Sequence, residues 1–134
     1  MDAIKFAPSS LPEVYTLDVA KKSGTAIGTA IGTGQSNTTA ILQAQGSGSY
    51  AAQLCDDLVL NGYDDWFLPS KDELNELYKH KNVIGGFDNN SIYCSSSENN
   101  NNTAGYQNFL NGYQYSTPYY DKGSLYRVRA VRAF

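Results

Sequence analysis

Few residues in this chain have the types and spacing that catalysis requires. Adjacent acidic residues occur at Asp56-Asp57, Asp64-Asp65 and Asp72-Glu73. Because neighbouring side chains on a helix or strand point in different directions, we interpret these pairs as helix caps and solvated faces. His80 is the only histidine and lies where a helix is expected to end, so the pattern offers no Ser/His/Asp triad. We therefore predict that the protein is not an enzyme.

Candidate metal ligands are equally sparse. Cys55 and Cys94 are the only cysteines and lack the spacing of a metal site or a disulfide framework. We expect two free thiols, with Cys55 buried on a helix, and keep a single disulfide as the alternative. Calcium could use oxygen atoms of residues 88–90 and Glu98, but the spacing of an EF-hand loop is missing. The prediction is that no metal and no cofactor is bound.

The composition is that of one globular domain spanning residues 1–134, with 41% hydrophobic and 17% charged residues. The net charge of −3 provides no basic surface for nucleic acid, and Arg127, Arg129 and Arg132 are spaced as on a strand. No apolar run is long enough for membrane insertion. Residues 1–10 do not resemble a signal peptide. The alternative locations are a phage particle, a cell surface and the inside of a cell.

The first two thirds of the chain contain the expected helices. Residues 24–34 are rich in glycine and predict turns, without the Gly-Lys-Ser/Thr of a phosphate loop. Asn37 or Thr38 could cap a short helix through Gln45. Apolar residues at helical spacing predict a helix near 51–60, ended by Gly62, and a capping box at Ser70 to Glu73 begins another near 70–80. Strands are expected at 14–17 and 66–68.

The C-terminal third lacks helical periodicity and favours strands at 92–95, 106–110 and 125–133. The order of elements therefore predicts an α+β domain. The expected core includes Trp66, Leu68, Leu74, Leu77, Phe109, Val128 and Val131.

An unusual segment lies within this third. Residues 93–126 hold seven of the eleven tyrosines, together with many Asn, Ser, Thr and Gly residues. Tyrosine offers a large contact area at low rotamer cost, and the small polar residues offer adaptable hydrogen bonds, as in antibody paratopes. Tyrosine is also common in strands and asparagine in turns, so composition alone leaves a plain strand-and-loop region as the alternative.

Several motifs together resemble a known family. The residues concerned are 51–55 (AAQLC), 62–74 (GYDDWFLPSKDEL), 93–98 (YCSSSE) and 126–132 (YRVRAVR), preceded by elements of 31–38. This combination resembles the DUF1566 family, also called the Legionella collagen-like protein C-terminal domain family. That family is similar to C-type lectins and to the formylglycine-generating-enzyme fold. The resemblance implies a C-type-lectin-like α+β domain in which two helices pack beside a small antiparallel sheet.

Within that family the chain is most similar to variable proteins of diversity-generating retroelements. There, asparagine codons are mutated at their first two bases, which yields any residue except Met, Trp, Gln, Lys and Glu. From Asn99 to Tyr126, only Gln107, Gln114 and Lys122 lie outside this reachable set. These three match fixed family positions, as do Ala104, Phe109 and Gly112. The sequence departs from the family at Cys94 and Gly105, where tryptophan is usual.

The resemblance implies a ligand-binding protein whose surface, within about 93–126, is diversified and whose partner is an unknown protein or surface ligand. Two alternatives stay open: a fixed-surface carbohydrate- or protein-binding adhesin, and an enzyme binding copper through Cys55 and Cys94. Calcium-dependent sugar binding is disfavoured because Glu-Pro-Asn, Gln-Pro-Asp and Trp-Asn-Asp motifs are absent. The expected scaffold residues are Ser95, Ser96, Glu98, Lys122 and Arg127. The expected binding residues are Thr103, Gly105, Tyr106, Leu110, Tyr113, Tyr115, Thr117, Tyr119, Tyr120, Asp121, Ser124 and Leu125.

Overall fold

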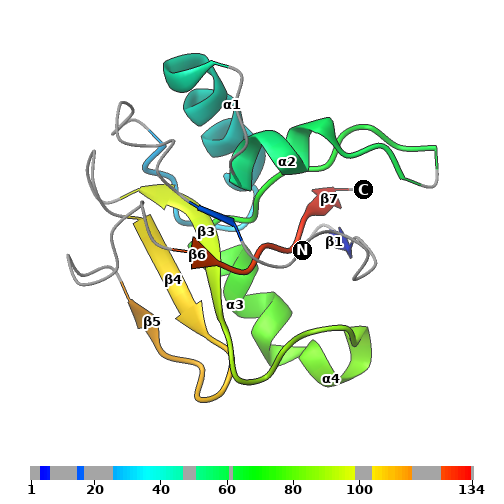
Figure 1. Ribbon diagram of the computed structural model, residues 1–134, viewed down its shortest axis with the longest axis vertical. Coiled ribbons are helices and arrows are strands. Elements are labelled where there is room, and N and C mark those ends of the chain that lie inside the picture. The colour runs from blue at the N-terminus through cyan, green and yellow to red at the C-terminus, as the bar shows by residue number, and fades with distance from the viewer. Residues whose placement is uncertain are drawn as a thin grey trace.

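The computed structural model describes four helices and seven short strands (Figure 1). None of the described helices has the length and apolar character that crossing a membrane requires. The helices are α1 (Gly34–Gln45), α2 (Ala51–Asp57), α3 (Lys71–Lys79) and α4 (Lys81–Ile84). The strands are β1 (Ile4–Phe6), β2 (Tyr15–Thr16), β3 (Ile92–Glu98), β4 (Ala104–Asn108), β5 (Gln114–Tyr115), β6 (Leu125–Tyr126) and β7 (Val131–Ala133). The residues that the structure describes are 4–6, 15–16, 26–46, 51–60, 62–98, 104–115 and 125–133.

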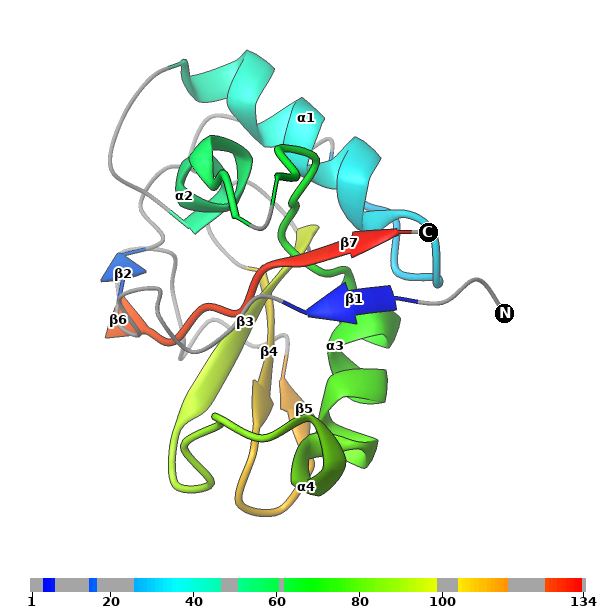
Figure 2. The same ribbon diagram turned by 90° about the vertical axis from the view of Figure 1, so that its right-hand side faces the viewer.

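Three small antiparallel sheets organise the described strands. The largest has the order β3-β4-β5, and the other two pair β1 with β7 and β2 with β6. The first and last of the described strands therefore lie side by side, as Figure 2 shows. Helices α1 and α2 lie at one end of the molecule, while α3 runs along the β4–β5 hairpin (Figure 2). This mixture of helices and antiparallel strands confirms the expected α+β class.

Helices α2 and α3 form where the sequence predicts them. Ser70 accepts a hydrogen bond from the backbone of Glu73, and Glu73 accepts one from the backbone of Ser70, which completes the capping box of α3. Helix α2 ends at Asp57, earlier than expected, and Gly62 lies beyond it in a turn with a φ of +80°.

The start of α1 differs from the prediction. The cap is Thr33, and neither Asn37 nor Thr38 occupies that position. Asn37 is buried and bonds the backbone of Gly28 instead, while the Thr38 hydroxyl donates to Gly34 within the helix. The Thr38 hydroxyl also accepts from the backbone nitrogen of Leu68 at 3.0 Å, so both polar side chains hold α1 in place, which local sequence could not reveal.

Two strand predictions were also wrong in detail. Residues 66–68 form no strand, because only a single bridge joins Phe67 to Val131. The expected strand at 125–133 is divided into β6 and β7, which pair with different partners. Tyr93 forms a parallel bridge to Arg127 at the point of division. The expected strand at 14–17 is present as the shorter β2.

Strand β3 separates two hydrophobic clusters. Cys94 belongs to the cluster beneath α1 and α2, whereas Tyr93 packs with residues of α3 in the other. Successive side chains of a strand point to opposite faces, so a strand between two clusters is buried along its length. All seven expected core residues are buried, namely Trp66, Leu68, Leu74, Leu77, Phe109, Val128 and Val131.

Candidate ligand-binding surface

The glycine-rich loop before α1 is tied down by side chains from distant segments. Asn37 both accepts from the nitrogen of Gly28 at 3.1 Å and donates to its oxygen at 2.6 Å. The Ser97 hydroxyl donates to the same oxygen at 2.6 Å, and a Glu73 carboxylate oxygen accepts from the nitrogen of Gly32 at 3.2 Å. With these donors engaged and a carboxylate beside them, the loop is not arranged to hold phosphate.

Residues at the start of α3 and along β3 are held by hydrogen bonds in this same region. The nitrogen of Lys71 donates to the Ser97 hydroxyl at 2.9 Å, joining α3 to the end of β3. Glu98 is buried, and one of its carboxylate oxygens accepts from the backbone nitrogen of Ala26 at 3.1 Å. Ser95 donates to the oxygen of Gly105 at 2.8 Å. These contacts agree with the structural roles expected for Ser95 and Glu98.

Arg127 and Ser96 also have structural partners. Arg127 pairs with Asp88 at 3.0 Å and donates to the Ser91 hydroxyl at 2.7 Å. The backbone nitrogen of Ser96 donates to the oxygen of Pro69 at 2.8 Å, and its hydroxyl accepts a 3.4 Å bond from Asn37. The fifth expected scaffold residue, Lys122, lies outside the described residues.

The oxygen ligands considered for calcium do not come together. Asp88 precedes β3 and Glu98 ends it, so the seven-residue strand separates them by roughly 20 Å at 3.3 Å per residue. The Asp88 carboxylate already accepts from the nitrogen of Asn90 and the hydroxyl of Ser91. These two hydrogen bonds lower its pKa below the ordinary value, the backbone bond having the larger effect. The arrangement holds a turn and offers no shared cation site.

Both thiols are buried within one hydrophobic cluster. Cys55 on α2 and Cys94 on β3 are fully inaccessible to solvent and not bonded to each other. Burial raises the pKa of Cys94 to about 12 and that of Cys55 well above its usual range, to which the nearby Cys94 contributes further. As expected, these are free thiols, with Cys55 on a packed helix. The two thiols lie in the same cluster, and burial favours their protonated form.

The adjacent acidic residues differ in exposure and in hydrogen-bond partners. Asp72 is exposed while Glu73 is buried as a cap. Asp65 forms a bidentate ion pair with Arg132 at 2.6 and 2.9 Å, and these bonds lower the pKa of Asp65.

Asp65 also lines a cavity of about 270 Å³. His80, which ends α3, is not among the residues that line this cavity. The cavity lining is Gln35, Thr38, Thr39, Asp56, Asp64, Asp65, Trp66 and Phe67.

Two of the expected binding residues are buried, which corrects their assignment. Tyr106 is 1% exposed and packs in the cluster that contains Trp66 and Cys94. Gly105 is also buried, and its oxygen accepts the bond from Ser95. Strand β4 is the central strand of its sheet and is covered on both faces, so alternation along it brings neither residue to the surface.

Two other expected residues are displayed to solvent. Leu110 is 64% exposed and Tyr113 is 66% exposed, both at the turn of the β4–β5 hairpin. Tyr115 and Leu125 lie on β5 and β6, and the structure describes only their backbone. The remaining expected binding residues lie outside the described part of the chain: Thr103, Thr117, Tyr119, Tyr120, Asp121 and Ser124.

The turn that carries Leu110 and Tyr113 is fixed by its own asparagines. The side-chain oxygen of Asn108 accepts from the nitrogen of Leu110 at 2.8 Å, and that of Asn111 accepts from the nitrogen of Tyr113 at 2.9 Å. The backbone of Asn108 also bonds Tyr113 and Gly112. Local bonds of this kind are the usual reason why asparagine occurs in turns.

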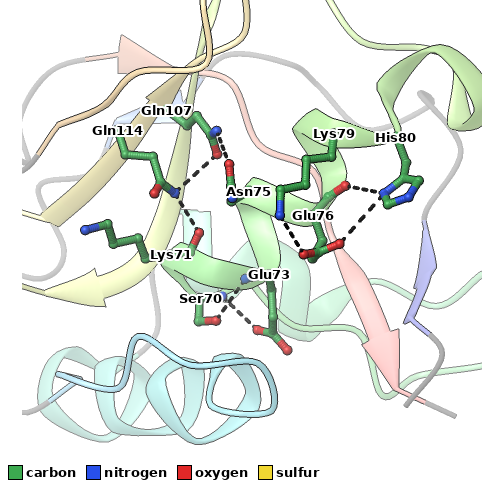
Figure 3. A network of polar contacts seen from close by, with 9 residues as sticks. All are labelled: Ser70, Lys71, Glu73, Asn75, Glu76, Lys79, His80, Gln107 and Gln114. Carbon is green, nitrogen blue, oxygen red and sulfur yellow. Dashed lines mark hydrogen bonds and ion pairs between the residues drawn. The ribbon is translucent and has the colours of Figure 1, made fainter. Parts of the chain in front are cut away.

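A chain of side-chain amides fastens the hairpin to α3 (Figure 3). Nε2 of Gln107 donates to Oδ1 of Asn75 at 2.8 Å and to the oxygen of Gly112 at 3.2 Å. Nε2 of Gln114 donates to the oxygen of Lys71 at 2.8 Å and to Oε1 of Gln107 at 3.4 Å. Both hydrogens of each amide nitrogen are thereby used, and the fully buried Gln107 is satisfied.

Aromatic packing completes the attachment of the turn. Phe109 is fully buried, and its ring lies 5.4 Å from that of Tyr78 and 4.4 Å from that of Tyr93, measured between centroids. The Lys81 ammonium donates to the oxygen of Phe109 at 2.6 Å. At Gly112, with a φ of +81°, an added Cβ would lie 2.6 Å from the Tyr78 ring. Only glycine fits here without movement.

Sequence reasoning missed Asn75, Tyr78 and Lys81 as supports of the surface. Lys71, Asn75 and Tyr78 are spaced i, i+4 and i+7, which places them along one side of α3. That spacing was available in the sequence, but nothing local indicates that a hairpin packs there.

Comparison with known proteins gives no assignment, since no family model and no curated protein matches the chain.

Proposed function

We propose that the chain is a ligand-binding domain of the DUF1566 type, with a surface diversified by a retroelement within about residues 93–126. The observation that carries the proposal concerns the hairpin. Gln107 and Gln114, which mutation of an asparagine codon cannot produce, hold the hairpin on α3. Leu110 and Tyr113, which it can produce, are exposed at the turn. At this hairpin, Gln107 and Gln114 thus support the backbone, while Leu110 and Tyr113 face solvent.

A C-type-lectin-like fold belongs to the same proposal. Its support is the pair of helices α2 and α3 at the expected positions beside the antiparallel β3-β4-β5 sheet. The pairing of β1 with β7 also brings the first and last described strands together.

The proposed function is non-covalent binding of a ligand, with no catalysed reaction. Tyr113 and Leu110 supply contact area, and the bonded turn beneath them loses little conformational freedom when a partner docks. The partner is an unknown protein or surface ligand selected by the variable residues. Nucleic acid is not proposed, because the net charge of −3 would oppose phosphate binding. An enzymatic function is not proposed either, since the thiols and Glu73 are committed to the interior.

One observation favours the alternative of a fixed surface. Gly105 and Tyr106 are reachable from asparagine codons but are buried, so free substitution there would disrupt the fold. In a fixed-surface adhesin, substitutions would be restricted in this way at every position within about 93–126. Calorimetry with calcium and simple sugars tests that alternative, and heat of binding from any sugar would favour it.

A display experiment tests the proposed function directly. The library randomises Leu110, Tyr113 and the expected binding residues that lie outside the described part of the chain, with codons ending in C or T. It is then selected against purified lysozyme. We expect folded, specific binders to be enriched. The control is a library of equal size at exposed helical positions, including Asn82 and Val83 of α4, which should yield fewer. Equal enrichment from both libraries would contradict the proposal.

A further inference from the structure

Asn75 lies on α3, outside the variable segment, yet its side chain contacts that segment. Its Oδ1 accepts from Nε2 of Gln107, the same nitrogen that donates to the oxygen of Gly112. Because Gln107 is fully buried, losing this acceptor would leave a buried N–H group without its partner. Asn75 therefore connects the helix to strand β4 and, through Gln107, to the turn that follows it.

The same side of α3 provides two more supports. The backbone oxygen of Lys71 accepts from Gln114 on β5 at 2.8 Å. The Tyr78 ring packs edge-on against Phe109 and closes off the space beside Gly112. The helix thus contacts both strands and the turn, and Figure 3 shows the amide part of this arrangement. The backbone at Leu110 and Tyr113 is held from beneath while their side chains extend outward.

We infer that Asn75 is a positioning residue for ligand recognition, and that Leu110 and Tyr113 are the specificity-determining residues of the described part of the surface. This inference rests on the proposed function, because it concerns the same surface. Gly105 and Tyr106 are assigned to the scaffold even though asparagine codons could produce them.

Hydrogen–deuterium exchange on three variants tests the positioning role. Asn75→Leu keeps a similar volume and removes the acceptor, so the amides of residues 107–114 are expected to exchange on the order of tenfold faster. Asn75→Asp keeps an acceptor and should preserve their protection. Lys79→Ala, at an exposed position on the same helix, is the control. Unchanged exchange in Asn75→Leu, or equal loss in Asn75→Asp, would overturn the inference.

A recognition measurement separates positioning from plain stability. In a variant selected against lysozyme, Asn75→Leu is expected to raise Kd by about tenfold at a temperature where the protein stays folded. Asn75→Asp and Lys79→Ala should stay within about twofold. If Asn75→Leu leaves Kd unchanged, the positioning role is wrong.

Substitution tolerance tests the two specificity positions. Charged, small and aromatic residues at Leu110 or Tyr113 should shift Tm by no more than about 2 °C, whereas charged or small residues at Tyr106 should prevent folding. Intolerance at Leu110 and Tyr113 would overturn their assignment. A gene without natural diversification would contradict the proposed function and leave these results unaffected, so the two failures are distinguishable.

Discussion

Gln107 and Gln114 face each other across β4 and β5, and the amide nitrogen of Gln114 donates to the amide oxygen of Gln107 over 3.4 Å. Each also bonds α3, so the pair joins two strands and a helix. Between Asn99 and Tyr126, these are the two described residues that mutated asparagine codons cannot encode.

Replacing Gln107 by leucine should lower the free energy of unfolding by about 2–3 kcal/mol. The change removes a buried amide that serves Asn75, Gly112 and Gln114. Urea denaturation measures the loss. Gln43→Leu, at an exposed position on α1, is the matched control and should change stability by less than about 0.5 kcal/mol. Equal effects of the two substitutions would contradict the structural role of Gln107.

Gly112→Ala should destabilise the protein more than Gly62→Ala. Both glycines have nearly the same φ, +81° and +80°, so an alanine is strained at either position. Only at Gly112 does the added Cβ meet the Tyr78 ring, whereas nothing lies within 4 Å at Gly62. We expect an extra loss of about 1–3 kcal/mol, measured by thermal denaturation. In a Tyr78→Ala background the extra loss should disappear, and its persistence would show that the ring is not its cause.

Glu73→Ala should cost about 2–3 kcal/mol, because the buried nitrogen of Ser70 and the nitrogen of Gly32 lose their acceptor. Glu76→Ala on the same helix removes only contacts with Lys79 and His80 at the surface and should cost less than about 1 kcal/mol. Chemical denaturation of both variants provides the comparison. A Glu73 effect no larger than that of Glu76 would mean that the loop is held by other contacts.

The thiols should be unreactive in the folded protein. With burial raising the pKa of Cys94 to about 12, roughly one molecule in ten thousand would carry the thiolate at pH 8. Cys55 is equally buried. A colorimetric thiol reagent at pH 8 should label neither residue in native protein and both in denaturant. Rapid labelling of folded protein would contradict this burial.

Acid should destabilise the fold through Asp65 and Asp88. The pKa of each is lowered in the folded state, by hydrogen bonds from Arg132 and from Asn90 and Ser91, respectively. A lowered folded-state pKa means that the stabilisation is complete above the unfolded value near 3.9 and is lost as the pH falls through the folded value. Tm should therefore be level above about pH 5 and fall below about pH 4.

The matching controls are Asp65→Asn and Asp88→Asn. Each should lower Tm at neutral pH, and its difference from the parent protein should shrink as the pH approaches 2. A difference that stays constant over this range would show that the ionised carboxylates do not contribute.

Local sequence patterns predicted the parts of the fold that depend on near neighbours. The capping box at Ser70 and Glu73 and the apolar spacing in 51–57 placed α3 and α2. The period-two pattern of 125–133 suggested one strand, but the chain there changes partner from β2 to β1. Choice of partner depends on tertiary contacts, which no local pattern encodes.

The candidate surface was predicted only in part, because burial also depends on tertiary contacts. Tyr113 and Leu110 lie in a polar turn, where exposure follows from the surrounding asparagines. Tyr106 is also surrounded in the sequence by small and polar residues, but it lies in a strand that is covered on both faces. Its burial depends on packing with residues of α1 and α2, which are distant in the sequence. Asn75 was missed because its partner, Gln107, lies 32 residues along the chain.

The most direct test of the central claim is deep sequencing of this gene across the population that carries it. We expect substitutions to concentrate in the codons of residues 93–126, including Leu110 and Tyr113, at sites that match template adenines. The codons for Gln107, Gln114 and Gly112 should stay constant. Even variation along the gene, or a quiet 3′ end, would contradict diversification and leave the tyrosine-rich surface as a fixed binding site.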